Sequence, residues 1–144
     1  MNKKRLILNF LPSIILLFII FIFSSQKANV SNSNSFQVLY LLKNIGIDLQ
    51  SSLGLHTANF IVRKIAHVME YFILSCFIYR GYKKSEFNNP LIYTFATIFT
   101  LACLDEIHQT FVPGRDGRFR DVLVDSIGVI LLTAFLKVKT YFKI

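Results

Sequence analysis

Residues 104–125 place a dense group of charged and polar side chains between two apolar segments, at residues 90–104 and 122–135. Charges beside membrane-like segments are costly unless they pair or reach water. Pro113-Gly114 and Asp116-Gly117 favour turns, so we expect the end of one helix, a tight arginine-rich turn and the start of another. The members of the group are Asp105, Glu106, His108, Gln109, Arg115, Asp116, Arg118, Arg120, Asp121 and Asp125.

The composition argues against an ordinary small soluble protein. The chain has 144 residues, of which 53% are hydrophobic and 15 are phenylalanine, and the apolar residues come in blocks. This length predicts a single domain, residues 1–144. The net charge of +8 could indicate nucleic acid, but the lysines and arginines flank the apolar blocks and no nucleic-acid motif is present. We therefore expect no nucleic-acid partner.

Four segments have the character of membrane helices, at about residues 6–23, 60–79, 90–109 and 121–137. The first contains 18 uncharged residues after Lys3, Lys4 and Arg5, and is too long for the core of a signal peptide. The sequence thus predicts an all-α, polytopic membrane protein with four transmembrane helices.

The connection between the first and second spans is predicted in two parts. Residues 24–35 read as a polar linker, and residues 36–53 as a short amphipathic helix lying on the membrane outside the cytoplasm. His56 is expected in a solvated loop just before the second span.

Basic residues predict the orientation of the spans. Both termini and the loop at residues 80–89 together carry nine lysines and arginines but only one acidic residue, Glu86. Cytoplasmic segments favour such an excess, so we expect a multi-pass protein of the cell membrane with both termini in the cytoplasm. All charged residues within the spans then fall in the outer half of the membrane.

The charges within the spans form stripes on helical faces. Arg63, His67 and Glu70 are spaced i, i+4, i+7, and Asp121 and Asp125 are spaced i, i+4. Asp105 forms similar pairs with His108 and Gln109 on the third span. Packing these stripes against one another is the least costly arrangement in lipid, so we expect them to meet in one outward-facing polar pocket.

Glu70 is the deepest charge on the second span. It lies about ten residues, or roughly 15 Å, from the expected start of that helix. An unpaired carboxylate at that depth is very costly. The expected partners are Arg63, Arg115 or His108.

The polar pocket has three interpretations, which the residues leave open. It could be a structural network that holds the helices together, or a binding site in which Arg115, Arg118 and Arg120 contact the phosphate or carboxylate of a head group. It could also be a catalytic or divalent-metal site. The absence of HExxH and CxxC motifs means that no cofactor is predicted, although a divalent metal stays an alternative.

Each interpretation assigns its own residues. The catalytic candidates are His67, Glu70, Asp105, Glu106 and His108. The candidates for ligand binding are Gln26, Arg63, Lys64, Gln109, Arg115, Asp121 and Asp125.

Several short motifs, in this order, resemble the VanZ-like family of bacterial membrane proteins over nearly the whole chain. They are Phe23-Ser24-Ser25-Gln26, Arg63-Lys64-Ile65-Ala66-His67-Val68-Met69-Glu70-Tyr71, Asp105-Glu106-Ile107-His108-Gln109, Pro113-Gly114-Arg115, and Asp121-Val122-Leu123-Val124-Asp125 followed by Gly128. The resemblance implies a small polytopic protein. The family's namesake is associated with resistance to teicoplanin, a lipoglycopeptide that acts at the outer face of the membrane.

The expected function combines the pocket with this resemblance. The chain is expected to bind or modify a cell-envelope component, or to confer resistance to teicoplanin-type antibiotics. Its expected partners are membrane lipid and either a lipid-linked envelope precursor or a lipoglycopeptide. One alternative is a membrane-embedded, metal-dependent hydrolase or transferase acting on a lipid-linked precursor, and a second is a purely structural membrane protein.

Overall fold

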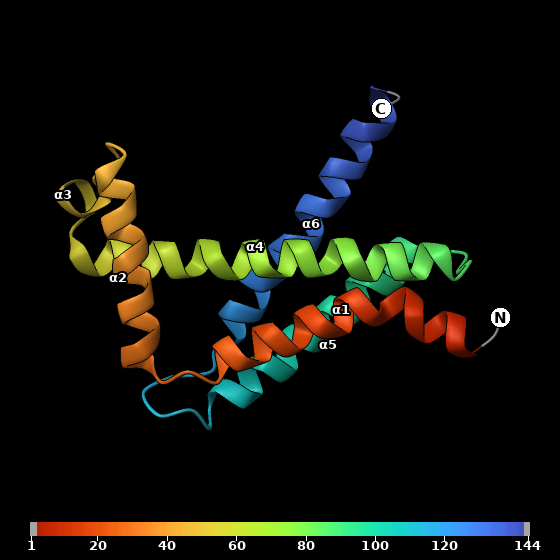
Figure 1. Ribbon diagram of the computed structural model, residues 1–144, viewed down its shortest axis with the longest axis horizontal. Coiled ribbons are helices and arrows are strands. Elements are labelled where there is room, and N and C mark those ends of the chain that lie inside the picture. Colours follow the sequence, from red (N-terminus) through yellow and green to blue (C-terminus); the bar gives the residue numbers. More distant parts are fainter. Residues whose placement is uncertain (1–2, 143–144) are drawn as a thin grey trace.

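The computed structural model describes residues 3–142 and contains helices joined by turns and irregular segments, with no strand in that range. The helices are α1 (Lys3–Ser24), α2 (Ala28–Asn44), α3 (Leu49–Leu53), α4 (Leu55–Lys84), α5 (Pro90–Gln109) and α6 (Phe119–Tyr141) (Figure 1). The all-α prediction is therefore confirmed.

Helix α4 is the centre of the fold. It packs against α1, α5 and α6 along its length, and its first turns contact α2 and α3 (Figure 1). The shared core includes Tyr71, Leu74 and Ile78 of α4, with Ile98 of α5 and Val129 of α6. Because α4 contacts each of the other helices, its polar face determines where a site can form.

Helices α4 and α6 cross at Gly128. A Cβ atom at this position would lie 2.5 Å from the backbone nitrogen of Phe72 and 2.6 Å from the carbonyl carbon of Tyr71. Real side chains do not approach backbone so closely, so only glycine allows this crossing. The close contact sets the register of α6 against α4.

Two helices have the length and composition of a membrane span, α1 (Lys3–Ser24) and α5 (Pro90–Gln109). The buried residues of α1 are Ser13, Ile20 and Ser24, whereas Phe18 is 66% exposed and Ile7 is 59% exposed. A helix that turns its large apolar side chains outward in this way is suited to lipid rather than to water.

The predicted boundaries differ most between the first two spans. Residues 28–35 are not a linker but the first half of α2, which contains no glycine or proline to stop a helix. The amphipathic segment predicted at residues 36–53 is broken by Gly46, whose φ is +91°. The short helix α3 then begins beyond this break.

The Asp48 side chain caps α3 by accepting a hydrogen bond from the Ser51 N–H, at 3.2 Å. That hydrogen bond and the neighbouring Lys43 lower the pKa of Asp48 below its ordinary value. The cap satisfies one of the free N–H groups at the start of this short helix.

The second predicted span is also longer than expected. Helix α4 begins at Leu55 and ends at Lys84, instead of covering residues 60–79. Polar residues precede the predicted start and basic residues follow the predicted end, but neither interrupts the helix. His56 therefore lies in the first turn of α4, exposed as expected but not in a loop.

Candidate functional site

Helices α1 and α5 end, and α6 begins, at the same end of the bundle (Figure 1). The polar residues gather at this end. The turn between α5 and α6 folds back onto this end of α5. A Cβ atom at Gly117 of the turn would clash with the backbone carbonyl of Glu106, so the turn approaches α5 closely only because this residue is glycine. This contact and the Gly128 crossing bring α4, α5 and α6 together.

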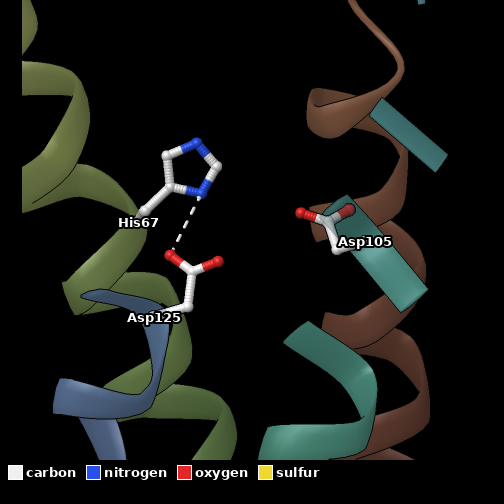
Figure 2. A group of neighbouring side chains, drawn as sticks. All are labelled: His67, Asp105 and Asp125. Atoms are coloured by element: carbon white, nitrogen blue, oxygen red, sulfur yellow. Dashed lines mark ion pairs between the residues drawn. The ribbon is translucent and has the colours of Figure 1, made fainter. Parts of the chain in front are cut away.

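Three side chains from these three helices face one another at the centre of the site: His67 of α4, Asp105 of α5 and Asp125 of α6 (Figure 2). One ligand atom from each lies within 4.8 Å of the others. The His67 Nδ1 atom is 3.8 Å from Asp125 Oδ1 and 4.0 Å from Glu70 Oε2. We call His67, Asp105 and Asp125 the central cluster.

The two aspartates of the central cluster are buried, the His67 side chain is 18% exposed, and the cluster is incompletely paired. Asp125 is only 2% exposed and Asp105 only 6%. The atoms His67 Nδ1 and Asp125 Oδ2 are inaccessible and have no hydrogen-bond partner among the described residues. Such groups cost free energy unless a further partner satisfies them.

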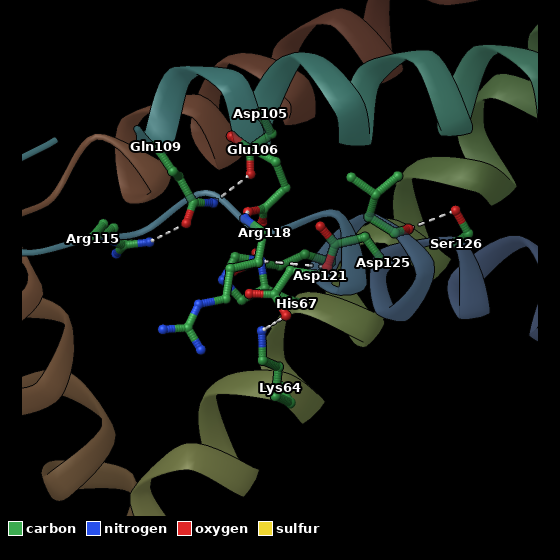
Figure 3. A network of polar contacts seen from close by, with 12 residues as sticks. Lys64, His67, Asp105, Glu106, Gln109, Arg115, Arg118, Asp121, Asp125 and Ser126 are labelled. Atoms are coloured by element: carbon green, nitrogen blue, oxygen red, sulfur yellow. Dashed lines mark hydrogen bonds and ion pairs between the residues drawn. The ribbon is translucent and has the colours of Figure 1, made fainter. Parts of the chain in front are cut away.

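The two acidic residues of α5 are held by the turn (Figure 3). Gln109 Nε2 donates to Asp105 Oδ2 at 2.9 Å, and Arg115 Nη1 donates to Gln109 Oε1 at 3.4 Å. The backbone N–H of Arg118 donates to Glu106 Oε2 at 2.8 Å. These contacts orient Asp105 and Glu106 before any ligand is bound.

Arg115 ties the turn to the corner between α1 and α2. Its Nε donates to the Gln26 carbonyl at 2.9 Å and its Nη2 to the Phe23 carbonyl at 3.5 Å. Burial, and then the nearby charge of Arg63, lower the pKa of Arg115 from its ordinary value. An arginine nevertheless keeps its charge in proteins, so the site contains a buried guanidinium.

The predicted partners of Glu70 interact elsewhere. Arg63 Nη1 donates to Asn32 Oδ1 of α2 at 3.1 Å, and Arg115 binds the carbonyls at the α1–α2 corner. His108 Nε2 lies 3.0 Å from Ser25 Oγ of α1, so this histidine faces away from the central cluster. Within the described residues, the one such partner close to Glu70 is His67, whose Nδ1 lies 4.0 Å from Oε2 and is charged only if the ring is protonated.

Lys64 and Asp121 form the closest ion pair of the site, at 2.6 Å between Nζ and Oδ1 (Figure 3). Both side chains are 22% exposed, so the pair borders the central cluster without being fully buried. The Gln26 side chain accepts a hydrogen bond from Asn34 Nδ2 at 3.0 Å. Asn32 and Asn34 were missed from the sequence because residues 24–35 read as a linker.

Two polar cavities and one apolar groove meet at these residues. The charged cavity, of about 570 Å³, is lined by fourteen residues that include Arg63, Lys64, Arg115, Arg118 and Arg120. A smaller cavity of about 200 Å³ lies beside α2 and shares Arg63, His67 and Arg115 with the first. The apolar groove, of about 380 Å³, is formed mainly by α1 and α5 and reaches Asp105 at its polar end.

Comparison with known families gives one match. The family model described as VanZ/LLP1 matches residues 10–140, a range that contains every residue of the central cluster and of the cavities' charged lining. No curated protein and no solved structure matches the chain.

Proposed function

Since the chain belongs to the VanZ/LLP1 family, we propose that it is a four-span membrane protein that binds the anionic head group of a cell-envelope amphiphile in its charged cavity. The amphiphile is a membrane lipid, a lipid-linked envelope precursor or a lipoglycopeptide of the teicoplanin kind. These ligands share a negatively charged head and an acyl chain.

One observation carries this proposal: the charged cavity and the apolar groove meet at the central cluster. His67 and Asp125 line the cavity, whereas Asp105 closes the polar end of the groove. The rest of the groove is apolar and includes Ile14 and Phe18 of α1. A head group in the cavity would thus place an acyl chain along the outward face of α1 and α5.

The arginines of the cavity support an anionic ligand. Arg63, Arg115 and Arg120 line the cavity, and none of them forms an ion pair with an acidic side chain within residues 3–142. Guanidinium groups bind phosphate and carboxylate through paired hydrogen bonds. Three arginines without acidic partners therefore leave positive charge for a ligand.

The four-span arrangement rests on α4 and α6. Both pack along α5, whose composition suits a membrane span, and both expose large apolar side chains, such as Ile65 and Met69 of α4 and Ile130 of α6. The excess of basic residues at both termini and at residues 80–84 favours cytoplasmic termini. The cavity then opens at the outer face, where envelope precursors and lipoglycopeptides are found.

A second function, hydrolysis or group transfer on a lipid-linked precursor, is favoured by the position of His67. This histidine and Glu70 lie at the wall of the smaller cavity, where they could exchange a proton with a bound head group. Turnover of a bound precursor by purified protein would distinguish this function from binding alone.

Binding can be tested with the protein purified in detergent. Native mass spectrometry would compare phosphatidylglycerol with diacylglycerol, which has the same acyl chains but no phosphate. We expect tighter binding of the phospholipid and a loss of about tenfold for Arg120→Gln, the cost of one charged hydrogen bond.

Arg5→Gln is the matched control, because Arg5 is exposed in the first turn of α1 and does not line the charged cavity. Its affinity for phosphatidylglycerol should equal that of the wild type. Equal binding of both lipids, or equal losses from the two substitutions, would contradict the proposal and leave the structural interpretation of the charges.

A further inference from the structure

The imidazole and the two carboxylates of the central cluster have no role in head-group binding by the arginines. We propose that His67, Asp105 and Asp125 bind a divalent transition-metal ion such as Zn²⁺ or Mn²⁺. This site deepens the proposed function, since a metal there would face the head group, but it can be tested without any lipid.

The geometry of the cluster suits a metal ion. Two ligand atoms that each lie about 2.1 Å from one ion are roughly 3 to 4.2 Å apart. The separation of His67 Nδ1 and Asp125 Oδ1, 3.8 Å, falls in this range. The ligand atom of Asp105 lies within 4.8 Å of both. Tetrahedral ligands are about 3.4 Å apart, so a side-chain adjustment of at most about 1.4 Å completes the set.

The unpaired atoms of the cluster are the second observation. Asp125 is only 2% exposed, and its Oδ2 has no hydrogen-bond partner among the described residues. His67 Nδ1, which Figure 2 shows directed toward Asp125, is likewise buried without a partner. A buried ring nitrogen and a buried carboxylate oxygen that face each other without partners are what a cation between them would satisfy.

The surrounding side chains do not supply that cation. Lys64 is engaged by Asp121 at 2.6 Å, and Arg63 donates to Asn32 on α2. Arg115 donates to backbone carbonyls and to Gln109, not to a carboxylate of the cluster. Within residues 3–142, the two aspartates of the cluster therefore form no ion pair with lysine or arginine.

The residues around the cluster have the form of an outer ligand shell. Gln109 fixes one oxygen of Asp105 and is itself fixed by Arg115, so the second Asp105 oxygen is oriented (Figure 3). Outer-shell contacts of this kind tune metal affinity. Glu70 Oε2 lies 4.0 Å from His67 Nδ1, at the border of the cluster.

The ligand types define the class of metal. One imidazole and two carboxylates suit zinc, manganese or iron better than calcium or magnesium, which prefer oxygen alone. Three protein ligands leave a coordination position open, as in catalytic zinc sites. Because His67 and Asp125 also line the charged cavity, that position would face a phosphate or carboxylate bound there.

The test measures metal binding by purified, full-length protein without lipid. Protein stripped with EDTA would be incubated with Zn²⁺ or Mn²⁺, desalted and analysed by elemental mass spectrometry, and its thermal unfolding would be followed with and without metal. We expect one ion per chain and a rise of about 5 °C or more in the midpoint at saturating metal.

Two ligand substitutions and one positioning substitution make the test specific. Asp125→Asn and His67→Ala should each abolish retention of the ion and the thermal shift. Gln109→Ala should weaken the affinity by about 10- to 100-fold without removing the site, because Gln109 only orients Asp105. If Asp125→Asn fails to fold, His67→Ala and Gln109→Ala decide the result.

His56→Ala is the control, because His56 is exposed in the first turn of α4, far along the helix from His67. It should retain metal as the wild type does. Wild-type protein that retains no metal, or equal retention by all variants, overturns the metal site. Stripped protein that still binds phosphatidylglycerol would separate this outcome from a failure of the head-group proposal.

Discussion

Replacing Gly128 by alanine tests how the crossing of α4 and α6 positions the site. The new Cβ atom would lie 2.5 Å from Phe72 N and 2.6 Å from Tyr71 C, both of which are backbone atoms of α4. Ordinary contact needs at least 3.4 Å, so the two helices must separate locally by about 0.9 Å, the difference between 3.4 and 2.5 Å. No side-chain rotation can relieve this clash.

Two opposing effects determine the magnitude. Alanine favours a helix over glycine by about 1 kcal/mol. Overpacking at a helix contact costs about 1–3 kcal/mol, and a gap of nearly 1 Å removes a quarter to a half of the dispersion energy of the neighbouring contacts. Tyr71 and Val129 lie at this interface and are almost fully buried. We expect a net loss of about 2 kcal/mol in the free energy of unfolding.

The same displacement acts on the central cluster, because Asp125 lies one turn before Gly128 on α6 and faces His67. A shift of about 1 Å in one ligand is enough to weaken a positioned site by orders of magnitude. Metal affinity of Gly128→Ala should therefore fall by at least about tenfold. Denaturant titration in detergent and the metal-retention assay measure the two effects separately.

Gly81→Ala is the matched control on α4. Its Cβ atom would also meet a neighbour at 2.6 Å, but the neighbour is the Phe10 ring, a side chain that can rotate. Its unfolding free energy should change by less than about 1 kcal/mol, and its metal binding should not change. If Gly128→Ala matches this control in both measurements, the tight crossing does not position the site.

Three further predictions concern orientation, coupling and the arginine-rich turn. A single cysteine at Arg118, in a background without native cysteines, should react with an impermeant thiol reagent on intact cells, whereas one at Lys84 should not; the reverse result would place the cavity in the cytoplasm. Glu70→Gln and Asp105→Asn should each remove most function in a resistance or envelope-phenotype assay, and the double substitution should be hardly worse, since coupled residues lose function non-additively; strictly additive losses would indicate separate sites. Arg115→Ala should lower the unfolding free energy by about 2 kcal/mol, because Arg115 is buried and donates hydrogen bonds to two backbone carbonyls. Arg118→Ala should lower it by less than about 0.5 kcal/mol. Equal effects would contradict the role of Arg115 at the corner between α1 and α2.

The helical architecture could be predicted from the sequence because the apolar segments and their breaks are local signals. The third predicted span, residues 90–109, has the same bounds as α5. Pro90 marks its start, and the Pro113-Gly114 turn follows its end. Helix α2 could not be predicted at its start. Residues 28–35 contain only Ala28 and Val30 as apolar residues, so their helicity depends on packing against α4 and not on a hydrophobic pattern.

The candidate site was predictable as a group but not as a set of contacts. Helical spacing correctly puts His67 and Glu70 on one face of α4, and an ion pair at 4.0 Å joins them. Spacing within a helix cannot show which neighbouring helix each face meets. His108 consequently lies against α1, three residues along the same helix from Asp105, although both appeared equally suited to the centre of the site.

The contrast between two charged groups at the same end of the bundle argues against a purely structural role for the central cluster. Lys64 and Asp121 show that α4 and α6 can neutralise an acid with a direct ion pair, at 2.6 Å. One turn further along the same two helices, Asp125 is more deeply buried, yet the residue that α4 places opposite it is a histidine, which is uncharged unless protonated. If the charges only held the helices together, a second lysine or an apolar pair would be less costly at that position. The incomplete pairing is therefore best explained by a partner that residues 3–142 do not supply.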